Sequence, residues 1–165
     1  MGFIYKEDIS LDEILRNLTH FHKEIDMKSP IISFNHSSYY EEEMGENLKR
    51  LWVSFENLID PENISSIKLE VRKIEEMWTQ KKQRTVNIDP GILSLNNFIL
   101  TSFKNYTHRV PLTQGVYADL TLIYDDKKGF KNLEWTYPDY KSEAFLNFLS
   151  HVRKKYKIQL DERKT

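Results

Sequence analysis

Apolar residues along the chain repeat with two periods, which separate the expected helices from the expected strands. A period near 3.6 residues predicts three helices, two of them over 11–25 and 61–81 and the third at the C-terminal end. Each follows a residue that commonly caps a helix N-terminus, at Ser10, Asp60 and Ser142.

Short apolar or alternating segments predict strands, at 3–5, 31–34, 50–57, 85–88, 98–103, 110–112, 116–124 and 130–135. In the segment 116–124, alternation places Val116, Ala118, Leu120 and Leu122 on one face, and Tyr117, Asp119, Thr121 and Ile123 on the other. Thr113-Gln114-Gly115 predicts a hairpin turn before it, Lys127-Lys128-Gly129 predicts another after it, and Asp89-Pro90-Gly91 has turn chemistry in which glycine permits a positive φ.

The order of these elements predicts the α+β class, with a mixed or mostly antiparallel sheet and about three helices, mainly on one face. The opening βαββαβ order is compatible with a ferredoxin-like core. The 165 residues, 39% of them hydrophobic, are enough for one core, so we expect a single domain over 1–165 whose charged tail, 160–165, frays.

Composition excludes several classes of protein. The chain has no cysteine, which excludes disulfides, iron–sulfur clusters and cysteine zinc sites. Its 24 Lys and Arg against 25 Asp and Glu do not indicate a globally basic nucleic-acid binder, although a local basic patch remains compatible. No run approaches the roughly 20 apolar residues that cross a bilayer, and the start lacks the apolar core of a signal peptide. We therefore expect a cytoplasmic protein without a membrane partner.

Known nucleotide and hydrolase motifs are missing. There is no phosphate-binding loop of the P-loop type, no G-x-G-x-x-G, no H-E-x-x-H and no G-x-S-x-G. These absences exclude an ordinary P-loop nucleotide hydrolase. The sequence does not identify a cofactor or a metal.

Two polar clusters lie in the first half of the chain. In the segment 39–45, Glu43 could act as a metal ligand or base and Tyr39 and Tyr40 could frame a pocket, or the segment is a solvated acidic helical turn with tyrosine packed on the sheet. Asp89 could bind a metal or orient a base, or could simply start its turn. The basic residues near the end of the second helix, Lys81, Lys82 and Arg84, complement the helix dipole.

Two more clusters lie in the second half. Arg109 suits a phosphate or carboxylate, and His108 can act as an acid, base or ligand; the alternative is a surface arginine beside a hydrogen-bonded histidine. Aromatic residues surround Asp139 in the segment 135–140, where they either line a pocket wall or plug the end of the core.

Taken in order, these pieces resemble the bacterial domain-of-unknown-function family 4416 over nearly the whole chain. The matching pieces are Tyr39-Tyr40, Glu43-Met44-Gly45, Leu48-Lys49-Arg50, Ser54-Phe55-Glu56, Ile59-Asp60-Pro61, Ile67-Lys68, 87–91, Lys104, His108-Arg109, 115–122 and 135–140. Ser37-Ser38 stands where the family tends to have threonine before the tyrosine pair, and Leu100-Thr101-Ser102 stands where a Leu-Ala-Thr stretch is usual; both keep a hydroxyl. The chain begins inside what resembles the family's first strand, so an upstream lead is expected to be missing.

The resemblance implies no activity, because members are mostly uncharacterised. Some carry an automatic label of GTP-binding protein, to which the missing phosphate loop gives little support. The motif residues that the resemblance singles out are polar and lie in turns, which is not typical of motifs that serve packing alone.

Two hypotheses follow. In the first, the chain binds or acts on a phosphate-bearing or other anionic ligand in one cleft. The anion is held by Arg109, His108 and Lys104, and a metal ligand or base comes from Asp89, Asp139 and Glu43. The pocket is lined by Tyr39, Tyr40 and Tyr137. The catalytic candidates are Asp89, His108 and Asp139. In the second, the chain is a non-enzymatic module for protein or RNA, and its motif residues form structural ion pairs, for example Arg109 with Glu43 or Asp139. A third option, homo-oligomerisation through exposed apolar residues, leaves the oligomeric state open.

Overall fold

The computed structural model describes residues 1–22, 24–35, 38–80 and 83–163, and its chain forms two compact units. Unit 1 is Met1–Pro90 and unit 2 is Gly91–Thr165. The expected single domain over 1–165 stays a prediction.

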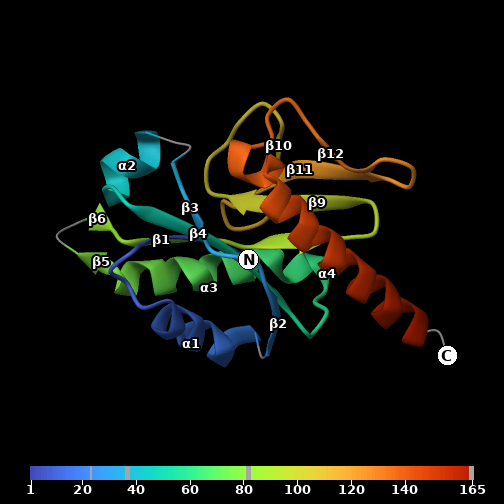
Figure 1. Cartoon of the computed structure of the whole chain (residues 1–165), viewed down its shortest axis with the longest axis horizontal. Coiled ribbons are helices and arrows are strands. Elements are labelled where there is room, and N and C mark those ends of the chain that lie inside the picture. Colours follow the sequence, from blue (N-terminus) through green and yellow to red (C-terminus); the bar gives the residue numbers. More distant parts are fainter. Residues whose placement is uncertain (23, 36–37, 81–82, 164–165) are drawn as a thin grey trace. The chain divides into compact units, whose positions relative to one another are not determined.

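Unit 1 is built on an antiparallel sheet in which β1 (Gly2–Lys6) lies between β4 (Leu48–Phe55) and β7 (Val86–Asp89) (Figure 1). On its other side β4 pairs with β2 (Ile25–Lys28) and β3 (Ile32–Ser33). The remaining elements are α1 (Leu11–His22), α2 (Ser38–Met44), the short η1 (Pro61–Asn63), α3 (Ile64–Met77) and the small strand pair β5 (Thr79–Gln80) and β6 (Gln83–Arg84).

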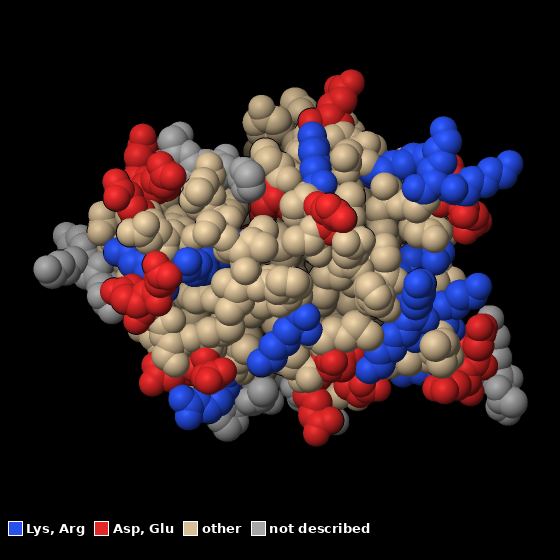
Figure 2. Space-filling view, viewed as in Figure 1, with Lys and Arg blue, Asp and Glu red and all other residues tan. Residues whose placement is uncertain are grey.

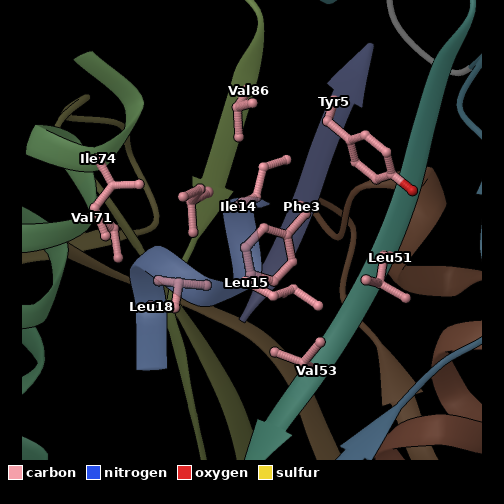
Figure 3. Packing of buried hydrophobic residues seen from close by; sticks show 11 residues of the cluster. Phe3, Tyr5, Ile14, Leu15, Leu18, Leu51, Val53, Val71, Ile74 and Val86 are labelled. Atoms are coloured by element: carbon pink, nitrogen blue, oxygen red, sulfur yellow. The ribbon is translucent and has the colours of Figure 1, made fainter. Parts of the chain in front are cut away.

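The core of unit 1 lies between this sheet and the helices α1 and α3. Alternate residues of the three central strands, such as Phe3, Leu51 and Val86, point to the face that both helices cover (Figure 3). Ile14 and Val71, which come from α1 and α3, are completely buried in the same cluster. Full burial of an aliphatic or aromatic side chain stabilises a fold by about 1.5–3 kcal/mol, so this cluster is the main source of stability in unit 1.

The opposite face of the sheet carries α2, and Arg50 and Asn87, which lie opposite Ile4 in the register, belong to this face. Ile4 and Leu48 pack there against Phe34 and Met44, and Tyr40 of α2 meets the ring of Phe34 edge-on at 5.6 Å. The packing of tyrosine on the sheet agrees with the helical-turn interpretation of the segment 39–45.

Unit 2 is built on an antiparallel sheet in the order β10 (Arg109–Pro111), β11 (Tyr117–Asp125), β9 (Asn97–Ser102) and β8 (Gly91–Leu93). The strand β12 (Gly129–Asn132) also pairs with β11, beyond β10. The short η2 (Pro138–Lys141) leads into α4 (Glu143–Glu162). The ring centroid of Phe145 on α4 lies 5.3 Å from that of Phe98 and 4.7 Å from that of Tyr140.

The α+β class and the antiparallel pairing are confirmed, with two five-stranded sheets instead of one and four α-helices among the described residues. The ferredoxin-like order is not confirmed. The hairpin turn at 113–115 is confirmed, with positive φ at Gln114 and Gly115, and the Ser142 hydroxyl accepts a hydrogen bond from Phe145 N as a helix cap.

Other predicted boundaries differ from those of the structure. Ile25 begins β2 and does not end α1, and α3 ends at Met77, so Arg84 lies in β6 and not at a helix end; Lys81 and Lys82 lie outside the described residues. The alternation expected in β11 breaks at a register shift between Leu120 and Leu122. The predicted tail, 160–165, overlaps the last turn of α4.

Asp89-Pro90-Gly91 is not a tight turn. Asp89 ends β7 and Gly91 begins β8, with only Pro90 between the two strands. Glycine is required at position 91 by space and not by its φ, because an added Cβ would lie 2.8 Å from both the carbonyl oxygen of Ile99 and the ring of Phe98.

We therefore expect Gly91→Asn to lower the free energy of unfolding by about 1–3 kcal/mol, as overpacking does. The matched control is Gly115→Asn, which has open space and a φ of +73° that asparagine adopts, and should change stability by less than about 0.5 kcal/mol. Urea unfolding of the two variants measures both values, and equal losses would contradict the steric explanation.

Candidate functional site

The predicted site residues fall into two groups, one in each unit. Unit 1 holds Tyr39, Tyr40, Glu43 and Asp89, and unit 2 holds Lys104, His108, Arg109, Tyr137 and Asp139. Their expected convergence in one cleft stays a prediction. The side chain of Tyr39 lies outside the described residues.

In unit 1, Glu43 and Asp89 belong to one connected polar network, here called the Asp89 network. Glu43 on α2 receives two hydrogen bonds from the Arg84 guanidinium, at 2.8 and 2.9 Å. Arg84 also donates to the Asn87 side chain at 3.1 Å, and Asn87 donates to Asp89 at 2.8 Å. The network thus links α2 to β6 and β7.

Two cations face Asp89 from other elements. Arg50 on β4 is completely buried, and its guanidinium lies 3.6 Å from the Asp89 carboxylate. The ammonium of Lys68 on α3 lies at the same distance from the other carboxylate oxygen. A carboxylate matched by two cations is typical of a structural ion-pair network, and the proposed roles of Asp89 and Glu43 in metal binding or catalysis stay predictions.

The same network completes the outer edge of β7. Lys68 donates to the carbonyl oxygen of Ile88 at 3.0 Å, and the amide of Ile88 donates to the Glu75 carboxylate at 2.6 Å. Two side chains of α3 thereby bond the main-chain groups that a neighbouring strand would otherwise bond. Burial raises the pKa of Glu75, and Lys68, the Ile88 amide and Arg84 oppose that shift without cancelling it.

In unit 2, Arg109 is the centre of a second group, here called the Arg109 cluster. Its Nε donates to Asp119 at 2.8 Å, and its Nη1 donates to the Ser102 hydroxyl at 3.0 Å and the Lys104 carbonyl at 2.9 Å. Its Nη2 donates to the Tyr137 hydroxyl at 2.7 Å. Four of its five donors are therefore bonded inside the unit. Burial acts to lower the pKa of Arg109, but its interactions with Asp119 and Tyr137 together outweigh burial and raise the pKa.

Asp119 is the ion-pair partner of Arg109, and it was not among the suggested partners Glu43 and Asp139. Asp119 is only 3% exposed, and its carboxylate also lies 3.2 Å from Nε2 of His108. The register explains the pairing, because Arg109 on β10 lies directly opposite Asp119 on β11. Asp139 lies buried in η2, where its carbonyl accepts hydrogen bonds from Ser142.

Aromatic rings surround the Arg109 cluster and remain partly exposed. The rings of His108 and Trp135 stack with centroids 4.7 Å apart and planes 10° apart, and Tyr106 meets His108 edge-on at 5.3 Å. Tyr106, Tyr137 and Trp135 are 64%, 47% and 38% exposed. We call Tyr106, His108, Trp135 and Tyr137 the aromatic surface.

The segment that carries Trp135 also closes a gap in the sheet. Between its pairing with β10 and with β12, β11 has two carbonyls that side chains bond: Trp135 donates to Leu120 O at 2.8 Å, and Thr136 donates to Thr121 O at 2.6 Å. The indole of Trp135 is thus fixed at its nitrogen end, while its ring takes part in the aromatic surface.

Sequence reasoning did not select Asp119, Arg84 or Tyr106 as site residues. Asp119 was assigned to a face of its strand but not to a partner, and opposite charges on paired strands were the available signal. Among the described residues, no group of three or more His, Asp or Glu side chains is placed to hold a metal ion. A depression in unit 1, lined by Asp12, Leu15, Arg16, Ile25 and Lys28, includes none of the predicted residues. No described helix has the length and hydropathy of a membrane span.

Comparison with known proteins identifies a family and nothing closer. The model of the domain of unknown function DUF4416 matches residues 1–156. No curated protein and no solved structure matches the chain.

Removing the Arg109 side chain should destabilise unit 2, because Asp119 would keep a buried charge without its main partner. We expect Arg109→Ala to lower the free energy of unfolding by about 2–4 kcal/mol, and Arg109→Lys to recover part of that loss. Arg72→Ala, which removes an exposed ion pair with Glu76, is the control and should cost less than about 0.5 kcal/mol. Urea unfolding measures all three, and an Arg109→Ala variant as stable as the control would refute the structural role.

The raised pKa of Glu75 gives the stability a specific pH dependence. The folded chain holds the Glu75 proton to higher pH than the unfolded chain, so the ionisation of Glu75 destabilises the fold as pH rises above the ordinary value of 4.5. The stability of the wild type minus that of Glu75→Gln should therefore fall as the pH rises above about 4.5. A difference that rises over this range, measured by urea unfolding, would contradict the shift.

Proposed function

The chain belongs to the DUF4416 family, and we propose that it is a non-enzymatic binding module that holds an extended, chain-like partner against the aromatic surface of unit 2. One observation carries the proposal: Arg109 bonds four of its five donors to Asp119, Ser102, Lys104 and Tyr137. Arg109 therefore acts as the support of the surface beside it.

The aromatic surface has the properties of a binding surface. Its tyrosine and tryptophan rings are large and partly exposed. Trp135 stacks on His108 and donates to Leu120 O, and the Tyr137 hydroxyl accepts a hydrogen bond from Arg109. Fixed aromatic side chains lose little conformational entropy on binding, so more of the contact energy appears as affinity. Their exposed area offers contacts to a partner that lies across them.

A small anionic ligand has less support. Arg109 has one donor left, and the cations of the Asp89 network each face a carboxylate: Arg50 and Lys68 face Asp89, and Arg84 faces Glu43. A bound phosphate would have to compete with these carboxylates.

The proposal is tested by comparing small ligands with polymers on the purified full chain. Phosphate, nucleotides, sugar phosphates and divalent cations should leave the melting temperature unchanged, whereas an array of peptides or single-stranded oligonucleotides should contain binders. Binding should be weakened in Tyr106→Ala, an exposed position whose truncation should change stability by less than about 0.5 kcal/mol.

Ile158→Ala, at another exposed apolar position of unit 2, is the control and should bind as the wild type does. Stabilisation by a small anion that Arg109→Lys abolishes would favour the ligand-binding hypothesis. Polymer binding that is undiminished in Tyr106→Ala would place the binding surface elsewhere.

A further inference from the structure

Resting on the proposed function, we infer that the partner of the aromatic surface is a single-stranded nucleic acid, whose bases stack on Tyr106 and Trp135 and whose phosphates meet nearby lysines. The formal charge of −1 hides an uneven distribution between the two units. Residues 1–90 contain 12 Lys and Arg against 17 Asp and Glu, whereas residues 91–165 contain 12 against 8. The unit that carries the aromatic surface is therefore the basic one, and such asymmetry favours a polyanionic partner.

Basic side chains of unit 2 lie at its surface. The ion pairs within the unit include those of Asp119 with Arg109, Asp125 with Lys131 and Asp126 with Arg153. Lysines that are exposed elsewhere in the unit include Lys104, Lys127, Lys128, Lys141, Lys154 and Lys157. Figure 2 shows lysine and arginine side chains gathered at the β11–β12 hairpin and along α4.

Two of these lysines adjoin the aromatic surface through their main chains. Lys104 lies in the same loop as Tyr106, and its carbonyl is held by Arg109. The amide of Lys141 donates to the carbonyl of Tyr137 in the η2 turn. Aromatic rings interleaved with cations are the arrangement that binds single strands, because the rings stack on bases while the cations follow the phosphates.

The edge of the sheet argues against a peptide as the partner. A peptide that adds to a sheet needs main-chain donors along an edge strand. At β10, Pro111 has no N–H, and the amide of Arg109 already donates to the carbonyl of Tyr106. A base needs only an exposed ring face, which Tyr106 provides with 64% of its surface exposed.

The test is fluorescence anisotropy of the full chain with labelled single strands of about 12 nucleotides, as RNA and as DNA of the same sequence, and with the duplex of equal length. We expect the single strands to bind more tightly than the duplex and to lose affinity as salt rises from about 50 to about 200 mM. Tighter binding of RNA would assign contacts to the 2′-hydroxyl, and equal binding would assign recognition to bases and phosphates alone.

The variants separate stacking from charge. Tyr106→Ala should weaken binding about tenfold, equivalent to about 1.4 kcal/mol, whereas Tyr106→Phe should keep the affinity because the ring alone stacks. Replacing Lys104 and Lys141 together by glutamine should weaken binding and reduce its salt dependence, and Lys73→Gln in unit 1 should change neither.

Equal affinity for the duplex, or full affinity in Tyr106→Ala, would overturn the inference, since binding would then not depend on stacking. Peptide binding that Tyr106→Ala weakens, together with no nucleic-acid binding at low salt, would overturn the nucleic-acid partner and leave the proposed function standing. No binding by either kind of polymer would overturn both.

Discussion

Both units depend on one constraint, which is that main-chain polar groups of a strand must be bonded even where no neighbouring strand lies beside them. In unit 1 the groups belong to Ile88, and Lys68 and Glu75 bond them. In unit 2 they are the carbonyls of Leu120 and Thr121, which Trp135 and Thr136 bond. An unbonded buried polar group costs about 1–3 kcal/mol, so each side chain that replaces a missing strand contributes about as much as one fully buried apolar residue.

This constraint explains why the polar motifs resemble catalytic or ligand-binding sites when only the sequence is considered. One network connects α3 to the edge of β7 through Lys68, Asp89 and Asn87. Another connects the segment before β10 to β11 through His108, Arg109 and Asp119. Charged residues that lie in turns next to strands are common both in catalytic sites and in such structural networks. The two kinds of site differ in which groups each charged side chain bonds. Those groups are set by pairing between segments that are distant in the chain.

Sequence predicted some features set by neighbouring residues and missed others: Asp89-Pro90-Gly91 is not a tight turn, and the Asp60 side chain makes no cap hydrogen bond to η1. The turn at Gly115 and the cap at Ser142 depend on two to four consecutive residues, and both were correct. The register shift in β11 and the pairing of Arg109 with Asp119 depend on strand pairing, which periodicity does not contain. The charge of the whole chain concealed a basic unit because the other unit is acidic, and the division after Pro90 was not predicted.

The bonding of Ile88 has a consequence for the variation that α3 can accept. Lys68 and Glu75 are seven residues apart, close to two turns of a helix, so both side chains leave the same side of α3 and converge on one residue of β7. Inserting or deleting a single residue between them would rotate one relative to the other by about 100° and leave one group of Ile88 unbonded. Point substitutions on the exposed side of α3 do not disturb this spacing. The length of the segment from 68 to 75 should therefore be fixed more strictly than its composition, and homologues that differ widely elsewhere should align through it without gaps.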